Sequence, residues 1–133
     1  MIRISIALIV LLAGCATPEK DKVDPLAGGW GGAHVGLVID AEGGKLEYDC
    51  ASGMIDHPLV LNGMGEFHER GTHTLGTGGP VREDAVPPSF PAVYEGSVQG
   101  DRMTLRVIVP SSGTVIGPLE LRHGAAPVLM RCL

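Results

Sequence analysis

Apolar and polar residues alternate with a period of two through most of the chain that follows Trp30. The clearest example is segment 45–50, in which Leu46, Tyr48 and Cys50 are separated by charged residues. Successive side chains of a strand point to opposite faces of a sheet, so this pattern is typical of a strand with one buried face. We expect the apolar face of this segment to line a core.

Seven further runs share this alternation. They cover residues 33–39, 55–61, 66–74, 92–98, 103–109, 115–121 and 128–132, and turn residues such as Asn62-Gly63 separate them. Eight sequential strands of this length predict an all-β domain, a small antiparallel up-and-down β-barrel that leaves no exposed sheet edges. A two-sheet β-sandwich is the alternative.

Composition agrees with this interpretation. The chain has 133 residues, enough for one domain, and its 20 glycines and 10 prolines favour frequent turns over helices. The formal net charge is −5 at pH 7, which makes nucleic acid and anionic lipid headgroups poor partners.

The N-terminus has the features of a secretory signal. Arg3 precedes the apolar stretch 4–12, which is too short to span a bilayer that needs about 20 residues. The sequence Leu12-Ala13-Gly14-Cys15 resembles the lipobox of bacterial lipoproteins. That resemblance implies cleavage before Cys15 and a diacylglycerol on its thiol; the alternative is an ordinary signal peptide with a chance cysteine.

The resemblance also implies a location. Ala16 stands where an aspartate would favour retention in the inner membrane, so we expect a lipid-anchored protein of the outer membrane, with its domain facing the periplasm. Residues 1–14 are then the signal peptide, residues 15–27 the lipid anchor and a charged tether, and residues 28–133 the barrel domain.

Two cysteines remain after processing. Cys50 and Cys132 can form only one intramolecular pair, and an oxidising compartment favours a disulfide between them. The predicted meander conflicts with this disulfide, because the second and the last strands lie two strand spacings apart, about 9.5 Å. Bridged Cα atoms need about 4.4–6.8 Å, so either the barrel narrows there or one cysteine lies beyond its strand.

Motifs for catalysis or cofactor binding are absent. No serine stands in a Gly-x-Ser-x-Gly or Ser-x-x-Lys setting, and no glycine-rich loop precedes a helix. His68 and His73 concentrate titratable groups on one segment, but they differ in strand parity, which favours solvated side chains over a zinc or copper site. We expect no catalytic residues, cofactor or metal.

Register predicts one polar pair inside the barrel. If Asn62-Gly63-Met64 forms a three-residue hairpin loop, His57 lies directly opposite Glu69, and both share the face of the core residues. A buried carboxylate needs a partner, which His57 could provide. The alternative is that both groups lie in water at the open end of the barrel.

Two weaker resemblances bear on fold and function. Gly28 and Trp30 are similar to the Gly-x-Trp opening of lipocalin and avidin-like barrels, in which the tryptophan plugs one end. The stretch with Tyr48, Cys50 and Gly53 is similar to the Tyr-x-Cys-x-x-Gly motif of periplasmic lysozyme inhibitors. A shared fold does not transfer function.

The sequence therefore favours a membrane-anchored binding or inhibitory module. A partner protein or small ligand would bind through the loop Leu75–Pro91 or the barrel interior. A structural envelope lipoprotein without a ligand is the alternative, and a hydrolytic enzyme is a third hypothesis with less support.

Overall fold

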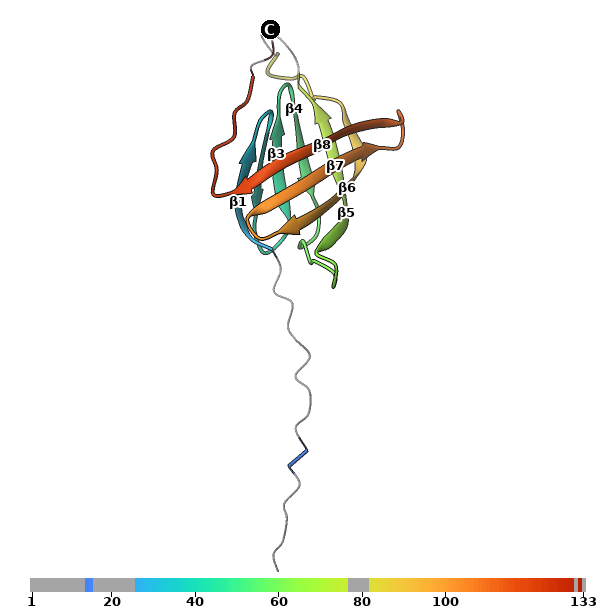
Figure 1. Ribbon diagram of the computed structural model, residues 1–133. Helices are drawn as coiled ribbons and strands as arrows, with labels where there is room; N and C mark the ends of the chain where they lie inside the picture. Colours follow the sequence, from blue (N-terminus) through green and yellow to red (C-terminus); the bar gives the residue numbers. More distant parts are fainter. Residues whose placement is uncertain (1–13, 16–25, 77–81, 131, 133) are drawn as a thin grey trace, which may run out of the picture.

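The computed structural model describes residues 14–15, 26–76, 82–130 and 132, and its eight strands form one closed antiparallel barrel (Figure 1). The strands follow one another around the barrel in chain order: β1 (Gly28–Gly32), β2 (Val35–Ile39), β3 (Gly44–Tyr48), β4 (Ala51–Ile55), β5 (Glu66–Leu75), β6 (Ser89–Gln99), β7 (Arg102–Val109) and β8 (Thr114–His123). The up-and-down barrel is confirmed. Within the described ranges no helix is long and apolar enough to cross a membrane.

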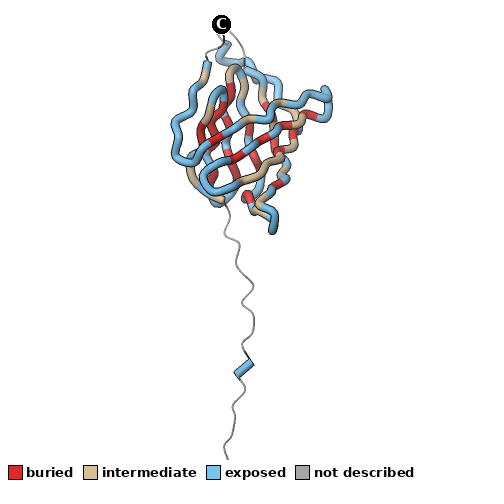
Figure 2. Tube along the Cα trace, viewed as in Figure 1, coloured by how far each residue is buried: buried red, intermediate tan, exposed pale blue. Residues whose placement is uncertain are grey.

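The core fills the inside of the barrel with one face of each strand. Alternation predicts this face correctly in β3 and β7, where Leu46 and Leu105 are among the fully buried side chains. Buried residues, coloured red in Figure 2, recur along the strands of the barrel. Trp30 is also buried and lies 4.9 Å from the His123 ring, centroid to centroid. The main core residues are Trp30, Val35, Leu37, Leu46, Leu59, Phe67, Tyr94, Met103, Leu105, Val107 and Leu121.

The pattern misses the strand that precedes residues 33–39. Residues 33–39 contain only β2, because the chain turns at His34, whose φ of 68° lies in the left-handed region. The strand before this turn is β1, whose sequence Gly-Gly-Trp-Gly-Gly carries a single large side chain. With so few side chains to alternate, β1 has no period-two signal.

The third predicted strand is displaced. β4 covers Ala51–Ile55, whereas the pattern predicts residues 55–61. Pro58 lacks an N–H group and restricts the preceding residue, so the ladder stops soon after Ile55. The predicted register is nevertheless correct within β4, since Ile55 lies opposite Gly71 of β5.

Residues 128–132 are not the last strand. After β8, residues 124–130 form an irregular segment, here called the C-terminal strap, that passes along the outside of β1 and β2. Val128 accepts a hydrogen bond from the His34 N–H at 2.8 Å and donates one to the Gly32 carbonyl at 3.0 Å. The strap approaches β1 so closely that a Cβ on Gly31 would lie 2.2 Å from the Ala125 carbonyl oxygen. Only glycine fits at position 31.

The disulfide between Cys50 and Cys132 is confirmed, with Cα atoms 5.1 Å apart. Both cysteines lie beyond strands, Cys50 in the turn after β3 and Cys132 beyond the strap, which resolves the predicted conflict of distances. Asp49 strengthens the same junction: its carboxylate accepts the Met130 N–H at 2.6 Å and also contacts the imidazole of His34. The Met130 hydrogen bond, followed by the contact with His34, holds the pKa of Asp49 below its ordinary value.

The disulfide predicts a measurable loss of stability on its removal. Cys50 and Cys132 are 82 residues apart, so in the chain-entropy model the bond removes up to about 4.5 kcal/mol of unfolded-state entropy. We expect the double substitution Cys50→Ser, Cys132→Ser to lower the free energy of unfolding by a large part of that amount in urea titrations. Cys15→Ser is the matched control, and equal stability of both variants would contradict the prediction.

Candidate functional site

Cys15 is an exposed, free cysteine in this structure. Most of the predicted signal peptide and tether lies outside the described residues, since only residues 14–15 and 26–27 are described between positions 1 and 27. Lipid attachment at Cys15 therefore stays a prediction.

The structure does not pair His57 with Glu69. Glu69 lies in β5 between the buried residues Phe67 and Gly71 and is half-buried, but His57 is exposed and follows the end of β4. None of the hydrogen bonds and ion pairs of the described residues joins the two side chains. The predicted register holds within β4, where Ile55 lies opposite Gly71, but Pro58 ends the strand before it can carry His57 into the barrel.

The two ends of the barrel differ. At one end the chain enters β1, and the Leu26 N–H donates to the Leu59 carbonyl at 2.8 Å. At the other end lie the disulfide and the loop between β5 and β6. That loop is shorter than Leu75–Pro91, because β5 continues to Leu75 and β6 begins at Ser89. Residues 77–81 of the loop lie outside the described residues.

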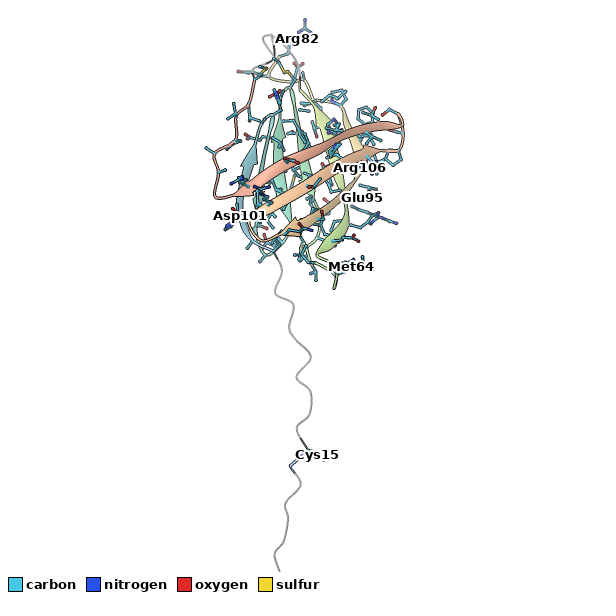
Figure 3. The ribbon with its side chains drawn as sticks, in the orientation of Figure 1. Cys15, Met64, Arg82, Glu95, Asp101 and Arg106 are labelled. Atoms are coloured by element: carbon cyan, nitrogen blue, oxygen red, sulfur yellow. A yellow bond between two sulfur atoms is a disulfide. The ribbon has the colours of Figure 1, made fainter. Side chains whose placement is uncertain are left out.

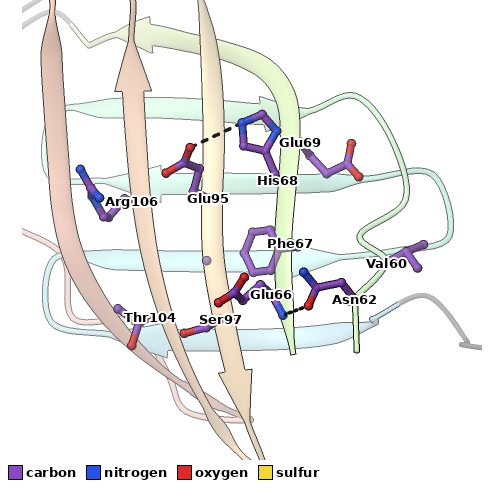
Figure 4. Close-up of a pocket in the computed structure, with 11 residues that line it drawn as sticks. Val60, Asn62, Glu66, Phe67, His68, Glu69, Glu95, Ser97, Thr104 and Arg106 are labelled. Carbon is purple, nitrogen blue, oxygen red and sulfur yellow. Dashed lines mark hydrogen bonds and ion pairs between the residues drawn. The ribbon is translucent and has the colours of Figure 1, made fainter. Parts of the chain in front are cut away.

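An open groove on the outer face of β5, β6 and β7 is a candidate for a binding site (Figure 4). Its volume is about 670 Å³. The strands contribute mainly alternate, outward-pointing residues, together with Phe67, Glu69 and Gly96 of the opposite parity. The segment between β4 and β5 forms the rim. The lining residues are Val60, Asn62, Glu66, Phe67, His68, Glu69, Glu95, Gly96, Ser97, Thr104 and Arg106.

Three ionisable side chains cross the groove in one row. Register places Glu95 directly opposite His68 on one side and opposite Arg106 on the other. His68 Nε2 lies 3.5 Å from Glu95 Oε1, and both side chains are well exposed. Exposed pairs of this kind contribute about 0–1 kcal/mol to stability, so this row contributes little to the stability of the fold. Its charges are free to engage a partner.

The floor of the groove is the sheet itself. Phe67 is buried beneath Gly96 of the neighbouring strand, and a Cβ at Gly96 would lie 2.4 Å from the Phe67 ring. Phe67 is only 4% exposed, so its ring packs against Gly96 on the core side of the sheet and offers almost no surface to a partner. The groove therefore offers a partner mainly the polar and charged side chains of its walls.

Asn62 stabilises the rim of the groove, which is the segment between β4 and β5. Its side-chain oxygen accepts hydrogen bonds from the N–H groups of Met64 and Glu66, both at 2.9 Å. The Asn62-Gly63 dipeptide therefore marks a turn, as predicted. Asn62 and Glu66 also join through a backbone hydrogen bond of 2.8 Å, so the pairing here is shifted from the predicted match of Leu61 with Gly65.

A second polar cluster lies inside the barrel near its disulfide end. The Tyr94 hydroxyl donates to the Thr72 carbonyl at 2.5 Å, whereas the buried Tyr48 hydroxyl and His73 Nδ1 have no hydrogen-bond partner. The rings of Tyr48 and His73 lie 5.7 Å apart. No pattern within one segment predicts this cluster, because its members come from three separate strands.

Burial sets the protonation of this cluster. It raises the pKa of Tyr94 to about 12, and it raises the pKa of Tyr48 further, with a smaller contribution from the nearby Tyr94 phenol. Burial also lowers the pKa of His73. All three side chains are therefore neutral near pH 7.

His68 and His73 lie on opposite faces of β5, as their parity predicts. His68 is exposed in the groove, and His73 is only 5% exposed inside the barrel. Among the described residues, no three His, Cys, Asp or Glu side chains gather closely enough to hold a metal ion.

Comparison with known proteins finds no matching family model, no matching curated protein and no matching solved structure. The functional argument therefore depends on the residues of the barrel itself.

The buried His73 predicts a loss of stability in mild acid. Its pKa is lowered on folding, so below about pH 6.5 the unfolded chain binds a proton that the folded barrel resists. The free energy of unfolding should fall as the pH decreases from about 7.5 to about 5, measured by urea titration. His73→Gln should flatten this dependence.

The pH range of this loss of stability distinguishes His73 from Asp49. Asp49 has a pKa below its ordinary value of 3.8, so its contribution is lost only under more acidic conditions. His57→Gln, at an exposed position, is the matched control. An unchanged acid dependence in His73→Gln would contradict the assignment.

Proposed function

We propose that the chain is a lipid-anchored protein of the bacterial cell envelope whose barrel binds a partner protein at the groove of β5, β6 and β7. The observation that carries the proposal is the open groove crossed by the row of His68, Glu95 and Arg106, on the outside of a barrel whose inside is filled. Binding proteins of this kind need an accessible surface rather than a catalytic group.

The filled interior argues against a small ligand in the lumen. Leu37, Tyr94 and Leu105 are each no more than 1% exposed inside the barrel. An eight-stranded barrel is just wide enough for side chains to fill it or for one small ligand to occupy it. Trp30 is buried in β1, as the resemblance to lipocalin and avidin-like barrels implies, but a filled core favours a partner on the outer surface.

The anchor is the second part of the proposal. The lipobox-like sequence at Cys15 supports it, and the barrel begins at Gly28, a short distance along the chain. Two acyl chains on one residue provide stable membrane binding, whereas one chain holds only marginally. The destination in the outer membrane and the orientation toward the periplasm follow from the same resemblance.

Anchoring has a direct test. Cys15→Ser should abolish incorporation of labelled palmitate and move the protein from the membrane to the soluble fraction or leave the precursor uncleaved. The measurement is membrane fractionation together with mass spectrometry of the mature N-terminus. A wild-type protein that begins elsewhere, without an acyl mass, would exclude the anchor and leave the groove proposal standing.

The groove has a separate test. Exchanging the charges in Glu95→Lys, Arg106→Glu preserves net charge but inverts the row that crosses the groove, so recovery of a partner from envelope extract should fall about tenfold or more. The matched control is Lys45→Glu, Glu47→Lys, an equivalent exchange between exposed residues of β3. Equal recovery with both variants, or no specific partner with the wild type, would favour a structural envelope protein.

A further inference from the structure

Two arginines lie directly opposite each other on neighbouring strands. Arg102 is the first residue of β7, and register pairs it with Arg122 near the end of β8. The adjacent residues Met103 and Leu121 are each 1% exposed and point into the core. Strand alternation therefore places both arginine side chains on the outer surface.

Neither arginine has an ion-pair partner within the described part of the chain, where the ion pairs join His34 to Asp49 and His68 to Glu95. Glu120 and Asp101 are the nearby acids in sequence, and neither comes within ion-pair distance. Like charges directly opposite each other on a sheet are destabilising. An anion between the two guanidinium groups would remove that cost.

The arginines line a hollow that is rich in hydrogen-bond donors. The hollow has a volume of about 670 Å³, and its lining also includes Ser97, Gln99 and Thr104. Beyond Arg122, the opposite residue on β1 is Gly31, and the strap that passes over it contributes the small side chains of Ala125 and Ala126 to the wall of the hollow. Glu120 is the single acidic residue of the lining.

We infer that this hollow is a binding site for a phosphate-type oxyanion, held between Arg102 and Arg122. Guanidinium groups present paired N–H donors that match the oxygens of a phosphate, and such charge-assisted hydrogen bonds are among the stronger polar contacts of proteins. The net charge of the chain argued against anionic partners. The register of β7 and β8 nevertheless places two positive charges side by side, which the net charge of the whole chain does not reveal.

The position of the site allows two sources of phosphate. Val98, near the end of β6, donates to the Gly65 carbonyl at 2.8 Å, which places the β6–β7 turn at the end of the barrel where the chain enters. Figure 3 shows Asp101, in that turn, far from Arg82 at the opposite end. A free phosphate compound can reach the hollow, and so can a lipid headgroup if the chain is anchored at Cys15.

Inorganic phosphate tests the site itself. Added to the full chain at constant ionic strength, phosphate should shift the side-chain N–H resonances of both arginines, whereas chloride should not. Arg102→Gln and Arg122→Gln should each weaken binding about tenfold. Glu120→Gln should strengthen binding, because it removes the one negative charge of the lining. Arg70→Gln, at an exposed position of β5 outside the hollow, is the matched control.

Vesicles distinguish a lipid headgroup from a soluble phosphate compound as the source of the bound oxyanion. If the site takes headgroups, the full chain should bind vesicles containing phosphatidylglycerol more strongly than pure phosphatidylcholine vesicles, and Arg102→Gln should remove that difference. Binding of inorganic phosphate without this difference assigns the site to soluble phosphate compounds. No arginine shift with either probe, or an equal loss in Arg70→Gln, would overturn the inference. Because the phosphate titration does not require the anchor, a failure of the anchor would not be mistaken for a failure of the site.

Discussion

The closure of the barrel depends on a very short seam. β1 and β8 share only the residue pairs Trp30–His123 and Gly31–Arg122, whereas the other neighbouring strands pair over most of their length. Beyond Gly31 the strap takes the place of β8 beside β1, through both backbone groups of Val128. The disulfide then fixes the end of the strap to the β3–β4 turn. The fold is therefore completed by a segment that has no regular secondary structure.

This arrangement explains which parts of the fold the sequence could reveal. β3 and β7 bury one face and expose the other to water, so a period of two identifies them directly. β1 consists mainly of glycine because the strap and β8 approach its backbone, and residues without side chains leave no pattern. Val128 and Met130 alternate as in a strand, yet they are 68% and 65% exposed on the strap. The total of eight strands was correct because the missed β1 and the wrongly predicted last strand cancelled.

The candidate sites were harder to predict for a different reason. Alternation within one strand gives the face of a residue, but a site on a sheet depends on which residues lie opposite one another. The match of Glu95 with Arg106 requires the register of β6 and β7. The match of Arg102 with Arg122 requires the register of β7 and β8. It also depends on the irregularity between Leu105 and Val107, which shifts the pairing of these two strands. The disulfide was predictable because cysteine chemistry limits its partners to one.

The opposite placement of the chain entrance and the disulfide has a mechanical consequence. A load applied between an anchor at the N-terminus and any point fixed at the disulfide end of the barrel would run along β1, parallel to the strand axis. The β1–β2 hydrogen bonds would then be loaded in shear, all together, instead of opening one at a time. The C-terminus could not peel away first, because Cys132 is covalently joined to the β3–β4 turn. Resistance to tension would then depend on the unfolding rate of the barrel, which is slow because all the β1–β2 hydrogen bonds must break together.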